Sequence, residues 1–137
     1  MMDLAEHNDG SFIPMKDVAE RQGVSLKYLE KILPSLTKSG MIEGVHGKGG
    51  GYRLKSSPDS CRVGDILRLT EGDLAPVTCV EQKAHHCERH TSCRTYPMWS
   101  ELNRLINDYL DGITLSALVN GELPDRRDRP EETEKEQ

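Results

Sequence analysis

Two short helical patterns joined at a glycine constrain the fold of this chain more than any other feature. Pro14 is well placed at a helix start, and Gly23 ends that helix after Gln22. Ser25 can then cap a second helix, from Leu26 to about Lys38. Because glycine tolerates positive φ at the bend, the two helices can cross as a helix-turn-helix. Two packed helices with no part in DNA binding are the less specific interpretation.

A glycine-rich segment follows and is predicted to form the tip of a hairpin. Residues 41–46 and 52–54 have the composition of two strands, and they flank Gly47–Gly51. Lys48 can meet a phosphate there, whereas the spacing is wrong for a nucleotide-binding loop. A short helix from Val63 to about Leu69 completes the unit. The predicted fold class is mainly α (α+β), a winged helix-turn-helix over residues 1–72 with a two-stranded wing.

An apolar helical stripe occupies the C-terminal third of the chain. It consists of Met98, Leu102, Leu105, Tyr109 and Ile113, at spacings of four, three, four and four. Only 35% of the residues are hydrophobic and 4% are aromatic, so a monomer can bury little large side-chain surface. We therefore expect a homodimer, with a long dimerisation helix and following segment over residues 98–120. Packing of the helix against its own domain is the alternative.

The charge of the chain is unevenly distributed. Its net charge is −5, yet residues 14–55 hold eight Lys and Arg side chains against four Asp and Glu side chains. That stretch carries +4, and the remainder carries −9. A local positive surface of this kind suits contact with phosphates. Residues 121–137 mix charge with proline and are predicted to be a disordered tail.

The start of the second helix and the wing supply the candidate DNA contacts. Lys27 and Lys31 can reach guanine or phosphate, and Glu30 can accept a hydrogen bond from a cytosine amino group. The predicted DNA-binding residues are Ser25, Leu26, Lys27, Tyr28, Glu30, Lys31, His46 and Lys48. The neighbouring apolar residues expected to face the core instead are Leu29, Ile32 and Leu36.

Residues 73–97 form a polar segment that concentrates sulfur and imidazole. It contains Cys79, Cys87, Cys93, His85, His86 and His90. Three thiolates suit an iron-sulfur cluster, which usually takes four protein ligands, and His90 is the first candidate for the fourth. Zinc is the chemical rival, but seven and five intervening residues exceed the two to four that separate paired zinc ligands. Thiols without metal, reactive or inert, are the third interpretation.

The chemistry expected of these cysteines depends on whether the protein lies in a reducing or an oxidising compartment. No apolar run reaches the length of a membrane span, and no signal-peptide pattern opens the chain, so we expect a cytoplasmic protein with no membrane partner. In a reducing compartment, clustered cysteines are more often metal ligands or redox thiols than disulfides. Cys61 stands apart and is predicted to be a buried small hydrophobe.

Several stretches together resemble the Rrf family of winged-helix bacterial transcription regulators. They are Asp17–Ser25, Tyr28–Leu33, Gly47–Leu54, the three cysteines and Ile113–Val119. The resemblance implies a homodimeric repressor, not an enzyme, that binds a pseudo-palindromic operator in double-stranded DNA. It also implies a 2Fe-2S or 4Fe-4S cluster at the cysteines that senses iron, redox or nitric oxide status. The residue before the wing tip, here His46, often probes the minor groove in this family.

Two positions depart from the family pattern. Members usually begin with about a dozen further residues that form the first half of helix one, and this sequence begins after them. In the best-known cluster regulators a histidine three residues after the last cysteine is the fourth ligand. Tyr96 stands at that position in this chain.

Two other functions are consistent with part of the pattern. The first is a regulator of the same fold whose cysteines sense thiols or partner proteins without a cluster. The second is a small electron-transfer protein that uses the cysteines directly. The second leaves the helix-turn-helix unexplained, and no second cysteine group or nucleophile-base pairing can be identified.

Overall fold

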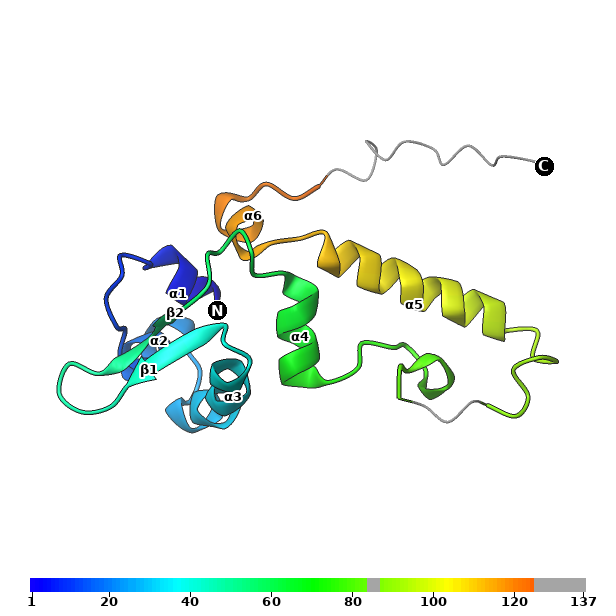
Figure 1. Ribbon diagram of the computed structural model, residues 1–137, viewed down its shortest axis with the longest axis horizontal. Helices are drawn as coiled ribbons and strands as arrows, with labels where there is room; N and C mark the ends of the chain where they lie inside the picture. The colour runs from blue at the N-terminus through cyan, green and yellow to red at the C-terminus, as the bar shows by residue number, and fades with distance from the viewer. Residues whose placement is uncertain (84–86, 125–137) are drawn as a thin grey trace.

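The computed structural model describes residues 1–83 and 87–124. The elements are α1 (Met2–Glu6), α2 (Met15–Gln22), α3 (Leu26–Lys38), β1 (Ile42–Val45), β2 (Gly51–Leu54), α4 (Val63–Glu71), the 3-10 turn η1 (Thr78–Val80), α5 (Tyr96–Asp111) and α6 (Leu115–Asn120). In Figure 1, α1 to α3 and the hairpin gather at one end, α4 stands in the middle, and α5 extends away. This arrangement confirms the predicted winged helix-turn-helix and its helix-rich class.

The helix-turn-helix forms from local signals. Gly23 ends α2 with φ at 62°, in the left-handed region that favours glycine. Ser25 caps α3, because its Oγ accepts a hydrogen bond from the Tyr28 N–H at 3.1 Å. Both helices have the predicted bounds, and α3 continues through Pro34 to Lys38.

The wing is an antiparallel hairpin with a third short partner. β1 and β2 pair from Ile42 opposite Leu54 to Val45 opposite Gly51, and Tyr52 also exchanges two 2.9 Å backbone hydrogen bonds with Ile13. A Cβ atom on Gly51 would lie 2.2 Å from the Ile13 carbonyl oxygen. This close approach explains why the segment entering β2 needs glycine.

The hydrophobic core lies between α1, α2, α3, the wing and α6. Its buried residues are Leu4, Ile13, Met15, Val18, Leu33, Leu36, Ile42, Leu54, Cys61 and Leu115. Cys61 is 2% exposed, which confirms its predicted structural role. Asp3 of α1 is also buried and accepts hydrogen bonds from Arg21 at 2.6 and 3.0 Å. This ion pair ties α1 to the end of α2.

Helix α5 contains most of the apolar stripe predicted for the C-terminal third of the chain. It begins at Tyr96, because Pro97 fits the first turn of a helix, and it ends at Asp111. Ile113, the last residue of the predicted stripe, lies outside α5 and is 4% exposed, and its carbonyl accepts a hydrogen bond from the Val63 N–H at 2.9 Å. The chain turns at Gly112 to bury Ile113 and then starts α6, whose Leu115 joins the core.

The predicted tail falls largely on residues 125–137, which lie outside the described residues, as do His85 and His86. Within residues 1–83 and 87–124, every helix is too short or too polar to traverse a lipid bilayer.

Candidate DNA interface and cysteine segment

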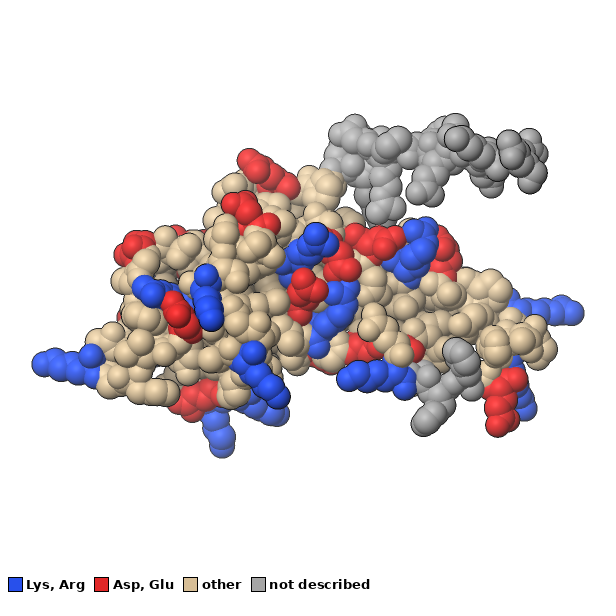
Figure 2. All heavy atoms as spheres, in the orientation of Figure 1, with Lys and Arg blue, Asp and Glu red and all other residues tan. Residues whose placement is uncertain are grey.

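The eight predicted DNA-binding residues are all exposed and come from two elements. Six lie on the N-terminal cap and first two turns of α3, and His46 and Lys48 follow β1 in the wing. Tyr28 is 50% exposed and Leu26 is 39% exposed. Figure 2 shows Lys and Arg side chains projecting from this end of the molecule. Leu36 is buried, and Leu29 and Ile32 are partly buried, as predicted.

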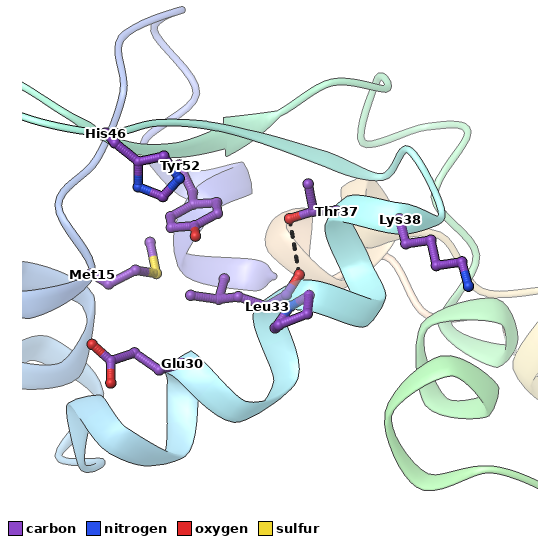
Figure 3. A pocket seen from close by; sticks show the side chains of 8 residues that line it. Met15, Glu30, Leu33, Thr37, Lys38, His46 and Tyr52 are labelled. Atoms are coloured by element: carbon purple, nitrogen blue, oxygen red, sulfur yellow. Dashed lines mark hydrogen bonds between the residues drawn. The ribbon is translucent and has the colours of Figure 1, made fainter.

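A groove of about 680 Å³ lies between α3 and the wing. It is lined by Met15, Glu30, Leu33, Pro34, Thr37, Lys38, His46 and Tyr52. Figure 3 shows Glu30 on α3 and His46 in the wing on opposite sides of the groove, with Met15 and Leu33 between them. The groove therefore brings two predicted residues from separate elements to one face. Sequence reasoning missed Thr37, Lys38 and Tyr52, although Tyr52 directly follows the glycine-rich tip.

The three cysteines of residues 73–97 are free thiols of intermediate exposure. Cys79 lies in η1, whereas Cys87 and Cys93 each lie directly before a turn. His90, the candidate fourth ligand, contacts the Cys87 carbonyl through Nδ1 at 2.9 Å. Its ring also meets the Tyr96 ring edge-on, with 5.8 Å between centroids. Tyr96, which stands at the family's usual position for the fourth ligand, thus lies beside His90, the candidate for that role in this chain.

Cys93 has a distinct environment. Its Sγ lies 3.3 Å from Thr95 Oγ1. The hydrogen bond from the Thr95 side chain, with backbone hydrogen bonds from Thr95 and Tyr96, lowers the pKa of the Cys93 thiol. Burial has the opposite effect on Cys61, whose pKa is raised. The lowered pKa increases the fraction of Cys93 that is present as thiolate, which is the reactive and metal-binding form.

The donors suit an iron-sulfur cluster in kind. Three thiols and an imidazole occur on one polar segment, and soft sulfur is the preferred ligand of iron in clusters. Over residues 1–83 and 87–124, however, no three His, Cys, Asp or Glu side chains lie close enough together to hold a metal ion. The segment would have to turn its thiols toward one another to hold a cluster.

Fold and surface together define the class of protein. A capped recognition helix, a wing beside it and an exposed basic face form a winged-helix DNA-binding unit. The family model described as Rrf2, an iron-dependent transcriptional regulator, matches residues 1–121. The chain belongs to the Rrf2 family and is a DNA-binding transcription regulator.

Named relatives and solved structures agree with this assignment. The chain is 36% identical over 132 residues to the HTH-type transcriptional regulator IscR of Vibrio campbellii, covering 93% of this chain and 77% of that protein. The structure of CymR, the global cysteine regulator of B. subtilis, superposes with a TM-score of 0.70 at 28% identity, covering 88% of this chain and 87% of that one. T. potens IscR gives a TM-score of 0.66 at 29% identity, covering 94% and 82%.

Proposed function

We propose that the chain is a homodimeric repressor that binds a pseudo-palindromic operator and changes its affinity with an iron-sulfur cluster. Cys79, Cys87 and Cys93 would hold the cluster, and His90 is the candidate fourth ligand. The observation that carries the proposal is a segment with three free thiols attached to a winged helix-turn-helix. Relatives named IscR support it. When bound, a 2Fe-2S or 4Fe-4S cluster supplies a centre that responds to iron, redox state or nitric oxide.

The DNA contacts divide between base reading and phosphate binding. Lys27 and Lys31 project from the first two turns of α3 and reach guanine or phosphate. Glu30 accepts a hydrogen bond from a cytosine amino group, and the Leu26 side chain can contact a thymine methyl. Ser25 and Tyr28 fix the phosphate backbone. In the wing, His46 enters the minor groove and Lys48 meets a phosphate.

Dimerisation through α5 would set the distance between two recognition helices. None of the sixteen residues of α5 is buried, and Met98 and Leu102 are 54% and 38% exposed. We expect Leu102→Glu to shift the dimer toward monomer in sedimentation experiments and to weaken operator binding. Ser100→Glu adds the same charge on the opposite side of the helix and is the matched control. If both variants stay dimeric, α5 is not the interface.

The test of cluster control uses an operator duplex selected from a random-sequence library. Protein prepared without oxygen should show sulfur-to-iron absorption, and its operator affinity should differ from that of the metal-free form by about 5- to 150-fold. Replacing Cys79, Cys87 and Cys93 together with serine should abolish both the absorption and the difference. A wild-type affinity that is the same with and without the cluster, and that the triple variant reproduces, would show that the cysteines do not control DNA binding.

A cluster-free thiol sensor is the second candidate function. The lowered pKa of Cys93 favours it, because the thiolate reacts with oxidants. In that case anaerobic protein would contain no iron, and Cys93→Ser alone would remove the response of DNA binding to peroxide. Iron analysis of the freshly isolated protein therefore separates the two candidates.

A further inference from the structure

A set of polar side chains connects the cysteine segment with α4, apart from the thiols and the DNA-facing residues. Asn103 of α5 donates a hydrogen bond from Nδ2 to the Val80 carbonyl at 3.1 Å. Val80 follows Cys79 in η1. Asn107, one turn further along α5, donates from Nδ2 to the Asn103 carbonyl at 2.8 Å and to its Oδ1 at 3.1 Å. Asn103 therefore holds η1 against α5, and Asn107 in turn holds Asn103.

Arg68 of α4 forms the next link. Its Nη2 donates to Asn107 Oδ1 at 2.9 Å and to the two carboxylate oxygens of Asp111 at 2.7 and 2.8 Å. Its side chain is 26% exposed, so salt screens these charge-assisted bonds less than those of a fully exposed pair. A Cβ atom on Gly64 of α4 would lie 1.9 Å from Asp111 Oδ1. Arg68 thus joins α4 and α5 where the helices approach closely.

A carboxylate holds the same segment at a second point. Asp73 accepts hydrogen bonds from the Gln82 N–H at 2.9 Å and from the Ala75 N–H at 2.8 Å. Asp73, Gln82, Arg68 and Asn107 border one cavity of about 320 Å³. Residues 80–82 are therefore fixed to α5 at one end and to the turn after α4 at the other.

The apolar side of α4 packs against the recognition helix. Ile66 and Leu67 of α4 line one apolar groove together with Ile32 and Leu36 of α3. The two helices contact each other directly, and Leu36 is only 3% exposed. Because packed interiors transmit displacement with little compression, α4 cannot shift far without moving α3 or opening this contact.

We propose that Asn103, Asn107 and Arg68 are positioning residues that carry a change in the cysteine segment to the recognition helix. We refer to these three residues as the relay. The inference rests on the regulated DNA binding proposed above and adds the route of coupling. Hydrogen-bond networks and packed elements carry energy between distant sites. Asn107 is the central link, because its amide donates to Asn103 and accepts from Arg68 at the same time.

Two substitutions cut the relay at chosen bonds. Asn107→Asp keeps an acceptor for Arg68 but loses the donations to Asn103. Asn103→Ala removes the donor to the Val80 carbonyl. Arg104→Ala is the matched control, because the ion pairs of this residue stay within α5 and involve no relay residue.

The first measurement compares operator affinity of the anaerobic cluster-loaded and metal-free forms of each variant. The ratio of the two dissociation constants should fall by about fivefold or more in Asn107→Asp and Asn103→Ala and stay constant in Arg104→Ala. Cluster absorption should be equal in all of them. If the wild type shows a ratio that both relay variants retain, the relay is wrong. A wild-type ratio of one speaks instead against the proposed function.

The second measurement needs no cluster. Coupling between binding free energies is reciprocal, so operator DNA should in turn bias the conformation of the cysteine segment. We expect this bias to change the rate at which iodoacetamide alkylates Cys79 in the metal-free protein. This change should occur in the wild type and in Arg104→Ala and be lost in Asn107→Asp. Alkylation of Cys93 in the same samples corrects for general exposure. The proposal fails if DNA leaves the wild-type Cys79 rate unaltered, or alters it equally in Asn107→Asp.

Discussion

The DNA-binding head and the cysteine arm of this molecule are held together in different ways. The head comprises residues 1–71 and 113–120, and the arm comprises residues 73–111. Among the described residues, all twelve buried hydrophobic side chains lie in the head, and no residue of the arm is buried. The arm consists of α5 and the polar segment before it, and hydrogen bonds from Asn103 and to Asp73 hold that segment in place. The head can therefore fold on its own core, while the arm depends on contacts that a signal or a partner can alter.

This difference suits the proposed division of labour. Regions with few buried apolar contacts open at lower free energy than the core, and regulatory segments commonly belong to such regions. In Figure 1 residues 87–95, which lead into α5, lie at the end of the molecule opposite the wing. A conformational change in the cysteine segment can reach the DNA-binding head only through α4 or α5. The contacts between these two helices would therefore transmit it.

The largest effect is expected from a cavity in the head. Leu115 is 2% exposed, so Leu115→Ala should lower the free energy of unfolding by about 2–5 kcal/mol. Urea denaturation followed by circular dichroism measures this loss. Leu123, which is 53% exposed, provides the control, since Leu123→Ala should change little. Equal losses in the two variants would contradict the placement of the core.

A smaller and pH-dependent effect is expected at the ion pair between α1 and α2. The hydrogen bond from Arg21 lowers the pKa of Asp3, against the opposing effect of burial. A carboxyl whose pKa is lower in the folded state stabilises the fold above its unfolded pKa of about 3.9. That contribution is lost as the pH falls through the folded-state pKa.

Asp3→Asn should therefore flatten the acid side of the plot of unfolding free energy against pH. Urea titrations at several pH values from about 2 to 7 measure the slope. Glu6→Gln changes an exposed carboxyl of the same helix and should leave the slope as it is. If the acid side of the plot has the same slope in Asp3→Asn as in the wild type, Asp3 does not cause the loss of stability at low pH.

The arm offers a test on the scale of a reaction rate. Thr95→Val removes the side-chain hydrogen bond that lowers the pKa of Cys93, so alkylation at neutral pH should slow severalfold. Mass spectrometry of labelled peptides over a pH series measures the rate for each cysteine. Cys61, which is buried and has a raised pKa, should stay unlabelled in the folded protein. If Cys93 is alkylated equally fast in Thr95→Val and in the wild type, the Thr95 hydrogen bond does not lower the pKa of Cys93.

The sequence predicted the head better than the arm for physical reasons. Gly23 and Ser25 act on their immediate neighbours, so the bounds of α2 and α3 followed from local chemistry. The end of α5 did not, because Ile113 continues the apolar period although it lies beyond the helix, where it is buried and hydrogen-bonded through its carbonyl to Val63. Burial by remote segments overrides a local pattern.

The candidate sites show the same contrast. The exposure of the α3 residues followed from helical periodicity. The relay was missed, because Asn103 and Asn107 have the spacing of an ordinary solvated helix face. Only the path of the chain brings Arg68 beside them. The arrangement of the cysteines likewise depends on how a long loop closes, which ligand spacing alone does not determine.

The smallest stability change is expected for a leucine in the arm, and it tests the comparison most directly. Leu102 is 38% exposed, so Leu102→Ala should change the unfolding free energy of the monomer by less than about 0.5 kcal/mol. If α5 is the dimer contact, the loss should grow with protein concentration, because association stabilises the folded chain by mass action. Urea titrations at low and high concentration measure both regimes. A large loss in the dilute sample would show that the arm has a core of its own, and the distinction between head and arm would fail.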